Sequence, residues 1–202
     1  MDRLAALLAL FILSPLLLFI FLLVRRFLGQ PVFFTQLRVG YRGRSFRIIK
    51  FRTMTSACDA SGALLPDCDR LTPFGTWLRA LSIDELPALF NVLRGEMSFI
   101  GPRPLLLDYL PLYSYEQAQR HDVLPGFSGW AQINGRNSIS WDERLRLDVW
   151  YVKHQNFMLD IWIFLITILK VLRRDGISAH GEATMPLFKG SSTSSSIPSD
   201  PF

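Results

Sequence analysis

With 202 residues, the chain is long enough for one domain with its own core and an appendage. Half of the residues are hydrophobic and the mean hydropathy is +0.24, which indicates contact with a bilayer, while the net charge of +5 fits a membrane surface, a nucleic acid or a phosphorylated substrate. The two cysteines, Cys58 and Cys68, have no histidine at metal spacing, so the sequence predicts free thiols in a reducing compartment and excludes a zinc site.

Residues 4–24 form an uncharged apolar segment, LAALLALFILSPLLLFIFLLV. A straight helix of that length would match a hydrocarbon core of about 30 Å. Pro15 at its centre removes one backbone hydrogen bond, and the hydroxyl of Ser14 is placed to satisfy a freed carbonyl. Two topologies fit: a spanning helix kinked at Pro15, which is the ordinary interpretation of such a segment, or a helix–break–helix hairpin that enters one leaflet and returns. Arg3 on one flank and two arginines on the other favour the hairpin, because positive charge holds both ends in the cytoplasm.

The segment after Gly29, PVFFTQLRVGYRGRSFRIIKFRTM, alternates apolar and basic residues around Gly40 and Gly43. This pattern predicts a β-hairpin with an arginine-rich face. Because the basic residues directly follow the apolar segment, anionic lipid headgroups are their first expected partner. The cations of this part of the chain are Arg25, Arg26, Arg38, Arg42, Arg44, Arg47, Lys50 and Arg52.

Downstream, the sequence predicts mainly helices. TPFGTWLRALS, residues 72–82, reads as a short amphipathic helix, and Ser82–Arg94 as a second helix ended by a glycine. Another helix is predicted over Leu105–His121, and SWDE at Ser140 is a capping box that opens a further one. The predicted fold class is therefore α+β: a mostly helical, membrane-associated domain with a small β-hairpin or sheet.

The last apolar run covers residues 157–174. It is short for a membrane span and carries Asp160, so an interfacial or core helix is favoured. The serine-rich end, residues 191–202, is interpreted as a disordered or non-native tail. The expected organisation is a membrane helix over residues 1–28, one domain over residues 29–190, and this tail.

Two adjacent acids, Asp84 and Glu85, stand at the head of the apolar run SIDELPALFNVLRG. Ser82 and Glu85 match the S-x-x-E capping box, which would make both acids structural. Pro87 argues against this box, because with Ser82 as the N-cap it falls where a backbone N–H is needed. With Asp84 as the N-cap, Pro87 falls at the third helical position, where the N–H has no partner. The sequence therefore favours a helix that begins at Asp84, with two carboxylates at an anion-attracting N-terminus.

Three arginines give the surroundings of this pair the character of a phosphate site: Arg79, Arg103 within GPRP, and Arg136 in the turn NGRN. The planar guanidinium suits phosphate oxygens. Each arginine alone would more simply be solvated or paired with a carboxylate, so their convergence on one site is the prediction. Asp142 and Glu143 are a similar adjacent pair, but SWDE gives them a capping box without a proline conflict, so a structural role is expected.

Several motifs, in their order along the chain, resemble those of the monotopic phosphoglycosyl transferases, the bacterial sugar transferase family, in its small, catalytic-domain-only form. They are the Ser-Pro of the apolar segment, KFRTM at 50–54, DELPALFNVLRGEMSFIGPRPL at 84–105, PGFSGWAQINGRN at 125–137, and ISWDERLRLDVWYV before the last apolar helix. The resemblance covers nearly the whole chain, from Leu4 to about Gly190. The sequence departs from the family pattern in having only Arg3 as a basic anchor before the apolar segment.

The resemblance implies transfer of a phosphosugar from a UDP-sugar to polyprenol (undecaprenyl) phosphate, with release of UMP, as the first membrane step of glycoconjugate assembly. It implies a location on the cytoplasmic face of the bacterial inner membrane. It also implies that residues 1–28 form a re-entrant, monotopic helix broken at Ser14-Pro15, and that residues 29–190 form the phosphoglycosyl transferase domain.

For the site, the resemblance implies that Asp84 and Glu85 are catalytic and that the same carboxylates hold Mg²⁺ as the cofactor. A carboxylate that is ionised at neutral pH can attack phosphorus without a separate base, so Asp84 is expected to form a covalent phosphosugar intermediate. Arg79, Arg103 and Arg136 are the expected substrate-binding residues. The roles of Glu85 in metal binding and in proton transfer are both left open.

The sugar is also left open. The segment GISAHGEATMPLFKG, residues 176–190, resembles that of small members that use UDP-N,N′-diacetylbacillosamine, which favours an N-acetylated UDP-sugar over UDP-galactose or UDP-glucose. The alternative of another class is a non-catalytic membrane adaptor whose basic hairpin binds anionic lipid. No nucleic acid partner is expected.

Overall fold

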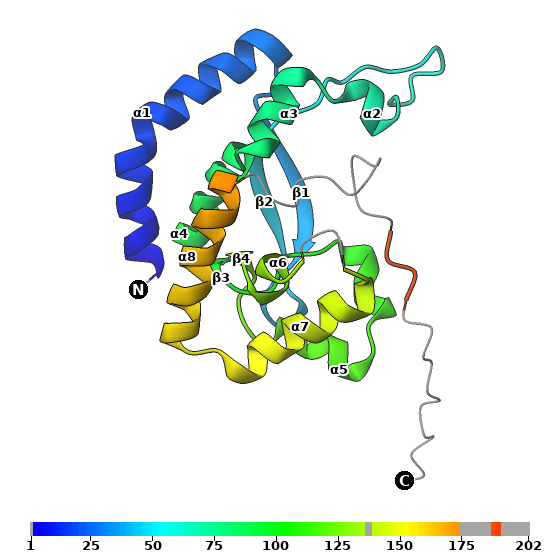
Figure 1. The fold of residues 1–202 in the computed structure, drawn as a ribbon. Helices are drawn as coiled ribbons and strands as arrows, with labels where there is room; N and C mark the ends of the chain where they lie inside the picture. The colour runs from blue at the N-terminus through cyan, green and yellow to red at the C-terminus, as the bar shows by residue number, and fades with distance from the viewer. Residues whose placement is uncertain (1, 136–138, 174–186, 191–202) are drawn as a thin grey trace.

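The computed structural model describes residues 2–135, 139–173 and 187–190. Helices surround two small sheets, and the long helix α1 (Asp2–Leu28) lies along one side of this body (Figure 1). The α+β class predicted from the sequence is confirmed. The predicted tail over residues 191–202 and the candidate residue Arg136 lie outside the described residues.

Helix α1 is one continuous helix through Pro15, without the break predicted there, and it bends along its length (Figure 1). Pro15 has no N–H to donate to the carbonyl of Phe11, four residues earlier. The Ser14 hydroxyl donates to that same carbonyl at 2.8 Å, which is the substitution expected from the sequence. The helix therefore keeps its regular geometry on both sides of the proline.

Both ends of α1 contact the same globular body. At the start, Asp2 Oδ2 accepts a hydrogen bond from Ser98 Oγ at 2.5 Å, and the Arg3 guanidinium lies over Gly95. At the end, the buried Arg52 donates to the carbonyls of Leu28 and Gln30. A cation at a helix C-terminus also complements the helix dipole. Arg52 thus fixes the end of α1, a role that the sequence did not suggest.

Most of α1 remains exposed although it is apolar. Within the described residues it is the one helix long and apolar enough to cross a membrane. Its buried positions contact two separate core clusters, one through Ala6 and the other through Ile20 and Val24. The large side chains on its outer surface are Leu4, Leu7, Leu8, Phe11, Ile12, Leu16, Leu18, Phe19, Leu22 and Phe27.

The predicted hairpin is confirmed. Strands β1 (Phe33–Val39) and β2 (Ser45–Phe51) pair antiparallel, joined by the short 3-10 turn η1 (Tyr41–Gly43). Residues opposite each other share a face, so the pairs Arg38–Phe46 and Phe34–Lys50 lie on the same side of the hairpin. This register brings Arg38 and Lys50 to one face although twelve positions separate them in the sequence.

The region around the two acids contains a 3-10 helix where the sequence predicts an α-helix. Helix α2 (Asp67–Arg70) lies in the polar loop, and α3 (Pro73–Ala80) confirms the predicted amphipathic helix, with the Thr72 side chain capping it and Pro73 in its first turn. Asp84 and Glu85 lie in a 3-10 helix, η2 (Ile83–Ala88), rather than at the start of an α-helix. The α-helix, α4, covers only Leu89–Arg94, and Gly95 ends it as predicted with a φ of +80°.

Ser82 adopts a left-handed conformation and its side chain caps no N–H. The capping box is therefore absent, as Pro87 indicated, but the prediction that Asp84 begins the helix was wrong. Pro87 lies inside η2, and in an α-turn its ring would clash with the carbonyl four residues earlier, which favours a short 3-10 segment at this point.

The prediction of one helix over Leu105–His121 was also wrong. The segment forms η3 (Leu107–Leu112), α5 (Tyr115–Ala118) and η4 (Gln119–His121). Pro111 lies inside η3, and the Ser114 side chain starts a new helix with a capping box.

The rest of the domain is built on a second sheet and three helices. Strands β3 (Ser98–Ile100) and β4 (Gly126–Ser128) pair parallel, and β4 is followed by α6 (Trp130–Ile133). Helix α7 (Trp141–His154) starts where predicted, with Ser140 accepting from the Glu143 N–H. The Glu143 carboxylate pairs with Arg146 instead of completing the box.

Helix α8 (Phe157–Arg173) packs one face on the core through Ile163 and leaves the other exposed. Asp160 is not free in this apolar helix, because Tyr151 on α7 donates its hydroxyl to the carboxylate at 2.7 Å. The helix is thus partly a core helix, one of the two alternatives predicted for this segment, and its interfacial position stays a prediction. Its large exposed residues are Phe157, Met158, Ile161, Trp162, Phe164, Leu165, Ile168 and Leu169.

Candidate active site

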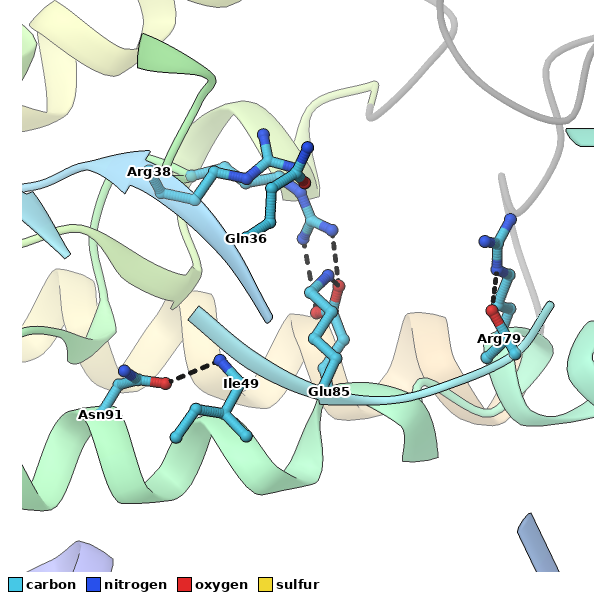
Figure 2. A network of polar contacts seen from close by, with 9 residues as sticks. Gln36, Arg38, Ile49, Arg79, Glu85 and Asn91 are labelled. Atoms are coloured by element: carbon cyan, nitrogen blue, oxygen red, sulfur yellow. Dashed lines mark hydrogen bonds and ion pairs between the residues drawn. The ribbon is translucent and has the colours of Figure 1, made fainter. Parts of the chain in front are cut away.

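Glu85 is held by two cations. Its Oε1 atom lies 2.6 Å from Lys50 Nζ and 2.5 Å from Arg103 Nη2, while Oε2 is 3.4 Å from Arg103 Nη1 (Figure 2). Burial alone would raise the pKa of Glu85, but the charges of Arg103 and Lys50 outweigh it and hold that pKa well below its usual range. Glu85 is therefore a permanently ionised anchor at neutral pH.

Asp84, its neighbour, is in the opposite situation. Only 9% of the residue is exposed, and its carboxylate forms no hydrogen bond or ion pair with any part of the chain that the structure describes. Burial and the adjacent Glu85 charge raise the pKa of Asp84 to about 6, with partial compensation from Lys50 and other cations. The two acids thus have different surroundings: Glu85 is tied by two cations, and the Asp84 carboxylate has no such partner among the described residues.

Arg79 approaches the pair from another direction. It extends from α3, donates its Nε to Thr53 Oγ1 at 3.0 Å, and lies on the opposite side of Glu85 from Arg38 (Figure 2). Its charge acts on Asp84. The structure therefore brings the predicted residues Asp84, Glu85, Arg79 and Arg103 together.

A pocket opens beside Glu85, between the hairpin and the segments around β4 and α7. Its charged lining consists of four cations, Arg38, Lys50, Arg103 and Arg144, and the single acid Glu85. Its other lining residues are Ile48, Ala88, Met97, Pro104, Leu105, Gly126 and Phe127. Such an excess of cations favours an anionic ligand.

The sequence reasoning missed Lys50, Arg38 and Arg144 as site residues. The sequence places Arg38 in a general basic run, and Lys50 both in that run and in the motif KFRTM, but strand alternation could have placed the two on one face of the hairpin. Arg144 is only 8% exposed and, with Asp148, occupies the buried face of α7 at an i, i+4 spacing. Two charged residues on the face of a helix that is expected to be buried are unusual, and this could have identified Arg144 as a candidate site residue.

Arg103 is supported from behind by a buried ion pair. Arg120 donates through Nε and Nη2 to Asp148 Oδ2, at 3.1 and 2.7 Å, and both side chains are almost fully buried. The same Nη2 also donates to the backbone carbonyl of Arg103 at 2.8 Å. Arg120 thereby connects α7 to the GPRP segment that carries the partner of Glu85.

The donor set of the acid pair fits a magnesium ion that is shared with a substrate. Within the described residues there is no group of three or more metal-ligating side chains. Mg²⁺, however, is commonly bound by one or two carboxylates together with substrate phosphates. Asp84 has a carboxylate without a protein partner among the described residues, and Glu85 lies next to it.

Comparison with known proteins shows which family the chain belongs to. The profile of the family described as bacterial sugar transferase matches residues 1–174. The uncharacterised sugar transferase EpsL of Bacillus subtilis is 52% identical over 195 residues, which cover 96% of each chain. A UDP-N-acetylgalactosamine-undecaprenyl-phosphate N-acetylgalactosaminephosphotransferase of Aeromonas hydrophila is 42% identical over 85% of this chain and 43% of its own.

An undecaprenyl-phosphate glucose phosphotransferase of Komagataeibacter xylinus is 41% identical over 83% of this chain and 34% of its own. This chain thus spans less than half the length of these two relatives named for a sugar, and nearly all of the Bacillus protein. The matched region includes the acid pair and every cation of the pocket. The chain belongs to the bacterial sugar transferase family, the phosphoglycosyl transferases that its motifs predict.

Proposed function

We propose that this enzyme transfers a phosphosugar from a UDP-sugar to polyprenol phosphate through a covalent intermediate on Asp84. The observation that carries the proposal is the contrast between the two acids: a buried carboxylate without a partner among the described residues, beside a carboxylate tied by two cations. A nucleophile needs a free carboxylate, and an anionic substrate needs surrounding positive charge.

In the first step, an oxygen of Asp84 attacks the sugar-side phosphorus of the UDP-sugar. The bond from that phosphorus to the bridging oxygen breaks, UMP leaves with the electron pair, and an acyl phosphate links Asp84 to the phosphosugar. In the second step, a phosphate oxygen of polyprenol phosphate attacks the same phosphorus. This releases Asp84 and gives polyprenol-diphosphate-sugar. Asp84 and Glu85 would hold Mg²⁺, which would supply positive charge to offset that of the substrate phosphates.

A re-entrant position of α1 in the membrane is part of the proposal. Asp2 contacts Ser98 and Leu28 contacts Arg52, so both ends of the helix contact one body. A spanning helix would place its ends on opposite sides of the bilayer, whereas a helix that dips into one leaflet leaves both on the cytoplasmic side. The exposed apolar surfaces of α1 and α8 would then face lipid, and Asp84 would lie close to the phosphate of the acceptor.

For the sugar, we propose an N-acetylated UDP-sugar such as UDP-N,N′-diacetylbacillosamine. The support is the resemblance between residues 176–190 and the corresponding segment of small family members. Most of residues 176–190 lie outside the described residues. The relatives named for N-acetylgalactosamine and for glucose are 42% and 41% identical to this chain. These identities are too close to each other to indicate which sugar this chain uses. UMP release measured over a panel of UDP-sugars, including UDP-galactose and UDP-glucose, decides the question.

The intermediate is directly testable by intact-mass spectrometry. Protein incubated with its UDP-sugar and Mg²⁺, without polyprenol phosphate, is expected to gain the mass of one phosphosugar and release one equivalent of UMP. Addition of polyprenol phosphate should remove the added mass. If one equivalent of UMP is released but the protein gains no mass, attack by Asp84 is contradicted.

The rate of this first step should depend on pH through Asp84. With its pKa raised to about 6, the carboxylate is mostly ionised at pH 7.5 and increasingly protonated below pH 6. The single-turnover rate of UMP release is expected to fall about tenfold per pH unit below that value and to be level above it. Circular dichroism at each pH confirms that the protein stays folded, and a rate that rises as the pH falls below 6 would contradict attack by ionised Asp84.

A further inference from the structure

Arg38 is a half-buried cation of the pocket that makes no ion pair with an acid of the described residues. Its guanidinium donates to the neutral side chain of Gln36 at 2.6 Å, and it forms no ion pair with the described part of the chain. It lines the pocket together with Lys50 and Arg103, but those two cations are compensated by Glu85. Burial and the nearby Arg103 charge lower the pKa of Arg38, as expected where cations are crowded.

Arg144 lines the same pocket from α7 and is held in place by aromatic rings. Its guanidinium lies 5.1 Å from the centre of the Trp141 ring. Trp141 in turn packs against Tyr109 and Phe188, with ring centres 5.4 Å apart in both pairs. A cation fixed on an aromatic face loses little entropy when it binds a ligand.

The end of the site that carries Arg38 and Arg144 is polar. Arg38 and Arg144 lie near the hairpin turn and the start of α7, where Arg42, Arg44 and Arg146 are exposed. The other end of the site carries Arg79 on α3, and there the ring of Phe74 packs 5.0 Å from that of Phe27 near the end of α1. A lipid phosphate would arrive from the apolar end, and a nucleotide from the polar end.

We propose that Arg38 and Arg144 form a subsite for a phosphate monoester, and that it holds the phosphate of the departing nucleotide. Its ligand class rests on the proposed function, because a nucleoside monophosphate is the leaving group of the first step. When the bond between the two phosphorus centres breaks, the bridging oxygen stays on UMP, whose phosphate becomes a dianion. Two guanidinium groups on the side away from Arg79 offset this charge through hydrogen bonds that strengthen as it develops.

The test uses the full chain in detergent, with UMP as the probe for direct binding. Arg38→Gln is expected to weaken UMP binding about tenfold and to slow single-turnover UMP release by a similar factor. The KM for polyprenol phosphate should change by less than about twofold. Arg144→Lys keeps the positive charge but loses the planar guanidinium, so it should weaken UMP binding by a smaller factor than Arg38→Gln does. Because the charge is kept, this variant is expected to fold even if a neutral side chain in the pocket causes misfolding.

Arg44→Gln, an exposed position on the same hairpin, is the matched control and should leave all three quantities unchanged. Unchanged UMP binding in Arg38→Gln would overturn the subsite. A raised KM for polyprenol phosphate with unchanged UMP binding would assign the two arginines to the lipid phosphate instead, which also overturns the proposal. The phosphosugar adduct of the wild-type chain, measured on the same sample, separates these outcomes from a failure of the proposed function.

Discussion

Replacing Asp84 with Asn is expected to reduce turnover by at least about a thousandfold and to abolish the trapped phosphosugar mass. The amide has nearly the same shape as the carboxyl group but cannot attack phosphorus. Since the Asp84 side chain forms no hydrogen bond or ion pair with the described residues, the substitution should disturb little else. Loss of activity would then report on chemistry and not on folding.

The same variant should be more stable than the wild type at neutral pH. The folded-state pKa of Asp84, about 6, lies above its unfolded value, so protons are released on unfolding between about pH 4 and 6 and stability falls as the pH rises through that window. Above it, the wild-type protein carries the full cost of a buried charge. Asn removes that cost, and the gain is expected to be about 1–3 kcal/mol at pH 7.5 and to vanish near pH 4.

Urea unfolding of both proteins at pH 7.5 and at pH 4 measures this difference. Asp108→Asn, at an exposed position in η3, is the control and should change neither activity nor stability. Retention of more than a few per cent of the activity by the Asp84 variant would exclude it as the nucleophile. Equal stabilities at pH 7.5 would mean that the carboxylate is compensated in the folded protein.

The sequence predicts best those features that depend on neighbouring residues. Thr72 and Pro73 specify the start of α3, Gly95 the end of α4, and alternation the hairpin. These signals act within a few positions, and tertiary contacts do not override them. The acid pair was identified for a similar reason, because Pro87 made the simple capping explanation inconsistent.

What could not be predicted depends on contacts between distant segments. The availability of Asp84 follows from the capture of Glu85 by Lys50 and Arg103, which come from β2 and from the segment after β3. The 3-10 geometry of η2 is decided by packing as well as by Pro87, since local preference allows either a 3-10 or an α-turn. Arg144 contributes to the pocket because Arg120 connects α7, through Asp148, to the backbone of Arg103.

The second large effect is expected at the buried pair of Arg120 and Asp148. Asp148→Ala leaves the Arg120 guanidinium buried without its counter-charge, and this is expected to cost about 3–5 kcal/mol of unfolding free energy. The pair of Glu143 and Arg146 provides the contrast, because the Arg146 side chain is 75% exposed. Glu143→Gln should therefore cost less than about 1 kcal/mol in the same urea titration.

Stability and positioning are separable at this pair. The double variant Arg120→Met with Asp148→Leu removes both charges of the pair, so most of the stability should return, apart from what Asp148 contributes through its attraction to Arg144. The carbonyl of Arg103, however, loses the donor that now lies 2.8 Å away, and the Arg103 side chain that ties Glu85 is less well held. The kcat of the double variant is therefore expected to stay about tenfold low despite restored stability, with a KM for the UDP-sugar that changes less. If restored stability brings full activity with it, the pair serves folding alone. If kcat stays low in a stable protein, Arg120 acts by positioning the GPRP segment.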